Sequence, residues 1–270
     1  MTEFRRTVLR ALGWSAGFKF IGQFVSVAFG IVLARILVPD DFGLIAMVMV
    51  FTGFASLLMD VGLGSALVQN RNIESIHYTT VFWTNLFLGV SIALVFFSCS
   101  PFLSEFYGRD EIEVISKILS VQFIVGSLAL VPRYVLVKNL DFRVISLADF
   151  FGMLVGGGFG ISMAYNGFGF WSLVVQLLAN SISSALFIWI NARWLPEFKY
   201  STNALKELFA FSFFVFATKT LQYSTKQLDK LLSGKFLGGE AAGLLDKAQS
   251  MMLFPVRNIS HVVGGVMFPA

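Results

Sequence analysis

Charged residues are scarce in this chain of 270 residues: they make up 13%, against about 25% in a typical soluble domain. Hydrophobic residues make up 56%, among them 31 phenylalanines, and the mean hydropathy is +0.77. Charge is missing from long blocks that recur along the chain, and about 20 apolar residues are enough to cross a bilayer. A large soluble domain is therefore excluded. The net charge of +4 then indicates the basic cytoplasmic loops of a membrane protein and excludes a nucleic-acid partner.

Groups that carry catalytic chemistry are equally sparse. The single cysteine, Cys99, forms no internal disulfide and gives no indication of the redox compartment. His77 and His261 are too far apart in the sequence to suggest a metal pair, and the segment Gly62-Leu-Gly64 follows no predicted strand, which argues against a nucleotide loop. The sequence contains no recognisable nucleophile–base pair, phosphate-binding loop or metal cluster. We therefore expect no enzyme activity, no cofactor, no metal and no direct use of ATP.

Eight apolar blocks divide the chain, each long enough for a transmembrane helix. The first block is too long for the hydrophobic region of a signal peptide and lacks a small-residue cleavage site, so we interpret it as an uncleaved helix. Turn-forming residues separate several blocks, for example Pro39-Asp40-Asp41 and Gly238-Gly239. The sequence predicts an all-α polytopic membrane protein with about eight transmembrane helices, at residues 12–38, 42–68, 79–103, 112–137, 145–165, 170–190, 205–232 and 241–268.

The basic residues of the loops predict the orientation. With eight crossings, the side that holds the N-terminus carries Arg5, Arg6, Arg10, Arg71, Arg133, Lys138, Arg143, Arg193, Lys199 and Lys206. The other side carries only Arg35, Arg109, Lys117 and Lys235. Because basic loops resist translocation, we expect the N-terminus in the cytoplasm.

Two stretches that lie 200 residues apart match without a gap. Residues 33–44 (LARILVPDDFGL) align with residues 233–244 (SGKFLGGEAAGL), so that Gly43 pairs with Gly243. The same register aligns three pairs far from these stretches: Lys19 with Lys219, Phe54 with Phe254, and Gly64 with Gly264. This pattern favours an internal repeat; the alternative is that two similar turns converged on the same residue types.

An internal repeat with this offset places six helices in its first unit. An even number of crossings returns the chain to the side on which it began, so the two units are parallel, as in transporters whose halves enclose the substrate site. We therefore assign residues 1–200 to a first six-helix half and residues 201–270 to the opening two helices of a second half. On this interpretation the chain is a fragment or a truncated product of a protein with about twelve helices or more.

Residues 33–44 resemble the LAR-L-P-(D/E)-FG signature of Wzx-like polysaccharide flippases, in the superfamily that also holds the multidrug and toxic-compound extruders. Further stretches similar to this family are residues 60–67, 140–143, 167–174, 228–232 and 242–248. The last stretch departs from the family pattern at Leu245 and Asp246, where an aromatic residue usually follows Gly-Leu. The resemblance spans essentially the whole chain, and it does not identify the sugar.

The resemblance implies a protein of the bacterial inner membrane that moves oligosaccharide repeat units from the cytoplasm to the periplasm. The cargo it implies is linked to undecaprenyl diphosphate, and the mechanism is alternating access. Its implied partners are this lipid-linked oligosaccharide, membrane lipid, and polysaccharide polymerase and chain-length proteins.

Charged residues inside the predicted crossings are candidates for a cavity, because a charge at the bilayer centre costs about 2.5–3.5 kcal/mol. On the seventh helix, polar residues recur at helical spacing and share one face. Shifted back by 200 residues, this stripe becomes a weakly polar one on the first helix. We expect a basic cavity that suits an anionic cargo, lined by Lys219, Lys226, Tyr223, Gln222, Lys19, Gln23 and Arg257. The alternative for several lysines is that they extend to the membrane interface.

Three acidic residues in or beside the crossings are candidates for ion coupling or charge pairing: Asp60, Asp149 and Asp229. Asp229 is three residues past Lys226 and is placed to neutralise it, whereas helix capping or hydrogen bonding between helices is the alternative for the other two. Separately, Gly152, Gly156 and Gly160 repeat at a spacing that favours close helix packing, with a hinge as the alternative.

Two other functions stay open on the sequence alone. The first is an ion-coupled exporter of cationic small molecules, which would need acidic residues rather than lysines along the cavity. The second is a remnant that does not transport, or a membrane partner that assembles with polysaccharide polymerase proteins.

Overall fold

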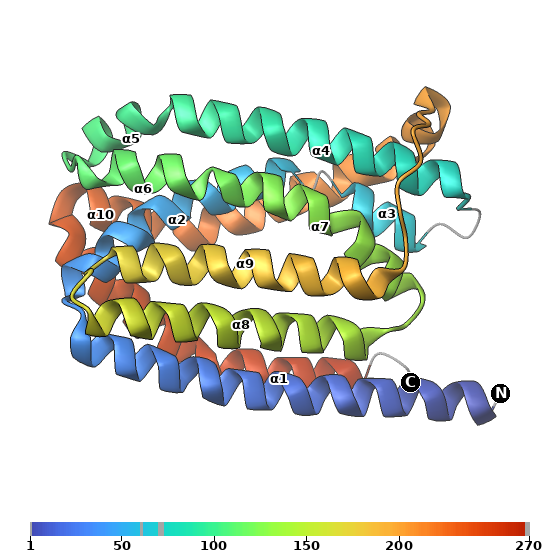
Figure 1. The fold of residues 1–270 in the computed structure, drawn as a ribbon, viewed down its shortest axis with the longest axis horizontal. Coiled ribbons are helices and arrows are strands. Elements are labelled where there is room, and N and C mark those ends of the chain that lie inside the picture. Colours follow the sequence, from blue (N-terminus) through green and yellow to red (C-terminus); the bar gives the residue numbers. More distant parts are fainter. Residues whose placement is uncertain (1, 60–61, 70–72, 268–270) are drawn as a thin grey trace.

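The computed structural model describes residues 2–59, 62–69 and 73–267. Within these ranges it describes the side chains except at residues 2–16, 19–20, 65, 69, 209–217, 219, 222, 224–226, 250–251 and 253–267. Every regular element in these ranges is a helix, which confirms the predicted all-α class. The helices lie roughly side by side along the long axis of the molecule (Figure 1).

The predicted apolar blocks coincide with helical segments. Three blocks each correspond to one helix: α1 (Thr2–Ile36), α8 (Phe142–Tyr165) and α9 (Trp171–Ala192). Three blocks each correspond to two successive helices: α2 (Pro39–Met59) and α3 (Leu63–Gln69), α4 (Ser75–Ser98) and α5 (Ser100–Tyr107), and α6 (Glu111–Leu119) and α7 (Val121–Lys138). The last two blocks lie in α10 (Thr202–Met267).

Glycine and proline account for interruptions that periodicity alone did not predict. Gly62 has a φ of 84°, a left-handed conformation that glycine adopts without steric cost, and it directly precedes α3. Pro101 lies in the first turn of α5, where its missing N–H removes no helical hydrogen bond, so α4 and α5 are separate helices. Gly108 ends α5 with a φ of 69°.

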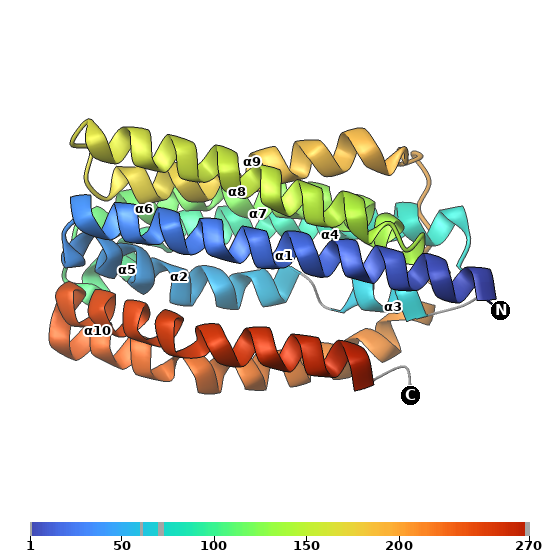
Figure 2. The ribbon, with the colours of Figure 1, turned by 90° about the horizontal axis from the view of Figure 1, so that it is seen from below.

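The longest helix, α10, is interrupted at Gly238, whose φ of 84° and ψ of −178° are not helical. Figure 2 shows α10 as two legs that run side by side in opposite directions and join at one end of the bundle. The turns between α1 and α2, α5 and α6, and α8 and α9 lie at the same end (Figure 1). We call this end the distal end, and the end that holds the N-terminus the N-terminal end.

The surface of the bundle is that of a membrane protein. Five segments of the described chain are long and apolar enough to span a bilayer: Pro39–Met59, Ser75–Ser98, Glu111–Lys138, Phe142–Tyr165 and Trp171–Ala192. Large apolar side chains stand exposed along them, including Phe87, Phe159 and Ile190. A soluble monomer rarely exposes so much contiguous apolar surface. The chain is therefore a polytopic membrane protein, and the total of eight crossings stays a prediction.

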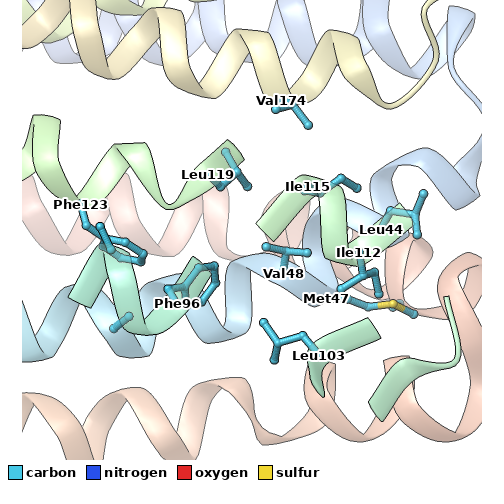
Figure 3. Close-up of a cluster of buried hydrophobic side chains, with 13 residues drawn as sticks. Leu44, Met47, Val48, Phe96, Leu103, Ile112, Ile115, Leu119, Phe123 and Val174 are labelled. Carbon is cyan, nitrogen blue, oxygen red and sulfur yellow. The ribbon is translucent and has the colours of Figure 1, made fainter. Parts of the chain in front are cut away.

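A tightly packed apolar core occupies the distal half of the bundle (Figure 3). It joins α2, α4, α5, α6, α7, α9 and the second leg of α10, and several of its side chains, such as Met47 and Ile115, are almost inaccessible. The rings of Phe96 and Phe123 meet edge to face, with centroids 5.2 Å apart, and so fix α4 against α7. This core gives the distal half a rigid centre.

Candidate functional site

The closest approach between the two repeated segments lies at the distal end, where α2 crosses the second leg of α10. A Cβ atom placed on Gly43 would overlap the carbonyl group of Gly239, and one placed on Gly243 would overlap the carbonyl oxygen of Pro39. The two contacts are equivalent, because an offset of 200 residues converts Gly43 into Gly243 and Pro39 into Gly239. Such a reciprocal contact is what a two-fold relation between matching segments produces.

An ion cluster covers this glycine contact. The guanidinium of Arg109, in the turn after α5, donates two hydrogen bonds to the Asp40 carboxylate, at 3.1 and 2.7 Å. It also donates to Glu111, from Nε at 3.2 Å. The hydrogen bonds that Arg109 donates to Asp40 and Glu111 raise the pKa of Arg109 above its already high ordinary value. Arg109 thereby joins the start of α2 to the turn between α5 and α6.

The first leg of α10 also packs against α2, through side chains. A Cβ atom on Gly234 would lie 3.0 Å from Cγ of Met47 and 2.9 Å from the ring of Tyr107. Nearer the middle of the bundle, the Tyr223 hydroxyl donates to backbone carbonyl oxygens of α2, at 2.8 Å for Val50. At Gly43 and Gly243 of the distal end, the contact between α2 and α10 therefore leaves no space for a side chain.

A cavity of about 460 Å³ lies between α2, α7 and α9. Its residues in α7 and α9 belong to the parts of these helices that run toward the N-terminal end (Figure 1). Apolar side chains alternate in its wall with amide and hydroxyl groups, and the polar residues of the lining are Ser56, Gln122, Arg133, Tyr134, Asn180, Ser181 and Ser184. In the part of the bundle that runs toward the N-terminal end, polar groups therefore face an open space, unlike the apolar core of the distal half.

The charge at this cavity is held in an ion pair. Arg133 donates to both carboxylate oxygens of Asp149 in α8, at 2.8 and 2.7 Å, and the Ser184 hydroxyl lies 3.5 Å from the same carboxylate. The Arg133 and Asp149 side chains are 40% and 49% exposed, so this pair is not buried in the protein. Paired in this way, the two side chains add no net charge to the cavity.

At the N-terminal end, the linker between α9 and α10 is fastened to the start of α4. Trp83 Nε1 donates to the Glu197 carbonyl oxygen at 2.9 Å, and the Ser201 N–H donates to Thr80 Oγ1 at 3.1 Å. Glu207 lies in α10 just after the linker, and its carboxylate is 3.3 Å from His77 of α4. The linker therefore packs against the start of α4.

The structure describes only some of the residues predicted to line a basic cavity. Asp60 and the side chains of Lys19, Lys219, Gln222, Lys226 and Arg257 lie outside the described part of the chain. Gln23 is half-buried in α1, and the hydroxyl of Tyr223 bonds to α2. The basic cavity therefore stays a prediction.

Three described acidic residues inside the predicted crossings, Asp149, Asp229 and Asp246, have polar partners. Asp149 pairs with Arg133, as described above, and Asp229 accepts a hydrogen bond from Gln249 Nε2 at 2.5 Å. Lys230 of the first leg of α10 lies 2.5 Å from Asp246 of the second leg. Asp149 and Asp246 are thus neutralised by cations on neighbouring helical segments, which lowers the cost of burying these charges.

Several residues of the cavity were missed in the sequence. Arg133 was counted with the loops, yet it lies inside α7 and faces the cavity. Asn180, Ser181 and Ser184 lie within the apolar helix α9, and their i, i+1, i+4 spacing is the signal that would have identified a polar face. The predicted glycine packing is confirmed, because Cβ atoms on Gly152 and Gly156 would collide with α9.

In the described part of the chain, no three His, Cys, Asp or Glu side chains gather into a group suited to a metal ion. No solved structure matches the chain significantly.

Comparison with known sequences gives a consistent result. A family model described as "Polysaccharide biosynthesis protein" matches residues 32–270. The teichuronic acid biosynthesis protein TuaB of Bacillus subtilis is 26% identical over 81% of this chain and 46% of its own length. The succinoglycan biosynthesis transport protein ExoT of Rhizobium meliloti is 29% identical over 98% of this chain and 53% of its own length.

A third relative, the lipopolysaccharide biosynthesis protein WzxC of Escherichia coli, is 24% identical over 98% of this chain and 54% of its own length. The chain therefore spans about half the length of the curated relatives that it matches.

Proposed function

Because this chain belongs to the polysaccharide biosynthesis protein family, we propose that it is part of a transporter that moves lipid-linked oligosaccharide repeat units across the bacterial inner membrane. One relative is named as a transport protein of succinoglycan biosynthesis, and another as a protein of lipopolysaccharide biosynthesis. The cargo in this proposal is an oligosaccharide on undecaprenyl diphosphate, and the N-terminus of the chain faces the cytoplasm.

The observation that carries the proposal is the unequal packing of the two ends of the bundle. At the distal end, the contact of α2 with α10 at Gly43 and Gly243 leaves no room for a side chain, whereas a cavity of about 460 Å³ lies toward the N-terminal end. Transport by alternating access needs one side closed while the other is accessible. With the N-terminus in the cytoplasm, this arrangement corresponds to the state that is closed toward the periplasm.

The reciprocal glycine contact supports a second part of the proposal, the division into two parallel halves. Residues 1–200 would form the first half, and residues 201–270 the opening two helices of the second. The contacts of Gly43 with Gly239 and of Gly243 with Pro39 support an axis between α2 and the second leg of α10. In the transport cycle the halves would rotate about one another and separate at this contact.

The charge of the cargo determines which residues the proposal assigns to binding. A diphosphate is bound best by cationic side chains. Lys219, Lys226, Lys19 and Arg257 are the basic residues whose positions in the sequence suit such a site, with Gln222, Gln23 and Tyr223 beside them. The lipid tail would stay in the bilayer while the headgroup crosses between the halves.

A double substitution tests this function. We expect Lys219→Ala plus Lys226→Ala, made in the full-length product of the gene, to abolish surface polysaccharide without loss of membrane insertion. Lipid-linked repeat units should accumulate on the cytoplasmic leaflet. The measurements are immunoblots of surface polysaccharide and of the protein in isolated membranes.

The matched control replaces two lysines that lie outside the proposed cavity. Lys199 and Lys206 are exposed near the N-terminal end, and their double alanine variant should produce normal polysaccharide. Normal output from the Lys219 and Lys226 variant would contradict the binding assignment. Altered resistance to cationic drugs, with polysaccharide unchanged, would instead identify an exporter of cationic small molecules.

A further inference from the structure

The cavity between α2, α7 and α9 has polar chemistry that the proposed diphosphate site does not use. Its volume of about 460 Å³ lies in the range of about 300–1,000 Å³ that encloses small ligands in proteins. Four uncharged residues supply amide or hydroxyl groups from α7 and α9: Gln122, Asn180, Ser181 and Ser184. Ser56 supplies a hydroxyl from α2 on the opposite side.

The polar groups of the cavity are oriented by hydrogen bonds among themselves. Gln122 Nε2 donates to Ser181 Oγ at 3.2 Å, which links α7 to α9 across the wall. That bond uses one of the two N–H donors of the amide, which can make up to four hydrogen bonds in all. The Ser56 hydroxyl donates to the Thr52 carbonyl oxygen at 2.8 Å and keeps its lone pairs for another donor.

The charge of the cavity argues against a phosphate and in favour of a neutral ligand. Among the lining residues that the structure describes, Arg133 alone is charged, and the Asp149 carboxylate neutralises it through two hydrogen bonds. An anionic diphosphate would have to break this pair or approach the carboxylate. A neutral ligand with many hydroxyl groups meets no such obstacle.

A sugar matches this wall in both polarity and shape. Each sugar hydroxyl donates and accepts hydrogen bonds, as amide and serine side chains do, and the rings of Phe123 and Tyr134 supply apolar surface. Inside a membrane protein an unsatisfied hydroxyl group is costly, so a carbohydrate that crosses the bilayer needs such partners.

We propose that the cavity between α2, α7 and α9 binds the sugar next to the diphosphate of the cargo, through the uncharged polar side chains of α7 and α9. The assignment rests on the proposed transport function, and it separates the site for the sugar from the basic site for the diphosphate. Gln122 and Ser181, which bridge two helices at the wall, contribute most to recognition.

The test measures binding to the full-length protein, purified in lipid nanodiscs. The probes are undecaprenyl diphosphate and its derivatives that carry one glucose, galactose or N-acetylglucosamine. At least one derivative should bind about tenfold more tightly than the bare lipid, as expected for about two additional hydrogen bonds. Gln122→Leu plus Ser181→Ala should reduce this preference below about twofold and leave the affinity for bare undecaprenyl diphosphate unchanged.

Two further variants keep the test decisive. Ser183→Ala, on the same helix but outside the cavity lining, should keep the full preference. Ser181→Ala alone removes one oxygen atom and little volume, so it should fold even where the double variant does not, and it should lower the preference about threefold.

The outcomes separate the two proposals. If the bare lipid binds and none of the three derivatives binds more tightly, the sugar site is wrong while the transport function stands. The sugar site is also wrong if Ser181→Ala and the double variant both retain the preference. If neither the bare lipid nor any derivative binds, the proposed function fails and this inference fails with it.

Discussion

The two ends of the bundle are built in opposite ways. At the distal end, glycines bring the backbones of α2 and α10 into direct contact, and the ion cluster of Arg109 covers them. Toward the N-terminal end, the helices keep a cavity with polar walls, and its ion pair is partly exposed. The comparison shows two ways to build helix contacts. Glycines, which have no side chain, let α2 and α10 come into direct contact, whereas the polar side chains around the cavity hold hydrogen bonds with one another.

The largest effect is expected where the distal closure depends on a missing side chain. Gly43→Leu places a bulky group against the carbonyl of Gly239, and overpacking of this kind costs about 1–3 kcal/mol or more. We expect the variant to hold the distal end apart and to lower surface polysaccharide more than about tenfold. The measurement is an immunoblot of the polysaccharide at equal amounts of membrane-inserted protein.

A matched glycine provides the control for this variant. Gly158 in α8 has open space where its Cβ would lie, so Gly158→Leu should leave polysaccharide output unchanged. Equal loss from both variants would show that leucine harms the helices in general, and the distal contact would have no special role.

An intermediate effect is expected from the ion cluster above the glycines. Arg109→Ala removes both hydrogen bonds to Asp40, in a pair whose side chains are 31% and 39% exposed. Because water screens such a pair, its loss should weaken the closure by about 1 kcal/mol or less and reduce transport by no more than about fivefold. The charge reversal Arg109→Asp with Asp40→Arg should recover part of the activity, and a reversal that behaves no better than the single variant would contradict the pairing.

The sequence predicted the helices, but not which residues of different helices meet. Apolar runs of about 20 residues in a membrane admit little besides helices, so this level of structure follows from composition. The alignment paired Gly43 with Gly243. It did not predict that these residues lie where α2 and α10 cross, because that depends on how the two legs of α10 pack against α2. Periodicity specifies the face of a helix, not its neighbour.

The charge pairs illustrate the same limit. Arg133 with Asp149, and Lys230 with Asp246, are each 16 residues apart on successive helical segments. Their separation allows a contact across a turn, but the contact also requires that each helix be rotated to present these side chains to the other. Arg133 was therefore assigned to a loop from its position near the end of a crossing, although it faces the cavity.

A smaller effect is expected from the ion pair at the cavity. Asp149→Asn removes a charge from a pair that is more exposed than the distal one, so stability should fall by about 1 kcal/mol or less. Thermal unfolding of the purified full-length protein measures this effect, and Asp229→Asn is the control because Asp229 bonds to an uncharged glutamine. A loss of stability as large as the cost of about 1–3 kcal/mol or more expected for Gly43→Leu would contradict the distinction between the two ends.

The smallest effect is expected at the linker between α9 and α10. Trp83→Phe keeps an aromatic ring, though a smaller one, and removes one hydrogen bond to the Glu197 carbonyl oxygen, worth about 1 kcal/mol. Because Ser201 of the linker and Glu207 of α10 still contact α4, polysaccharide output should stay within about twofold of normal. Severe loss of transport in this variant would indicate that the movement needed for transport occurs at the linker rather than at the distal end.

The central claim, that the distal end closes and must open during transport, is tested most directly by a reversible cross-link. Cγ of Met47 lies 3.0 Å from the Cβ position of Gly234, about the separation between a sulfur atom and the opposite Cβ in a disulfide. We therefore propose Met47→Cys plus Gly234→Cys, with Cys99→Ser, in the full-length protein. Transport of lipid-linked repeat units is measured in inverted membrane vesicles before and after oxidation.

The prediction is that the disulfide forms readily, stops transport, and releases it again when a reductant is added. The two single-cysteine variants should transport equally under oxidising and reducing conditions. Complete cross-linking with transport undiminished would show that the distal end stays closed throughout the cycle and would contradict the claim.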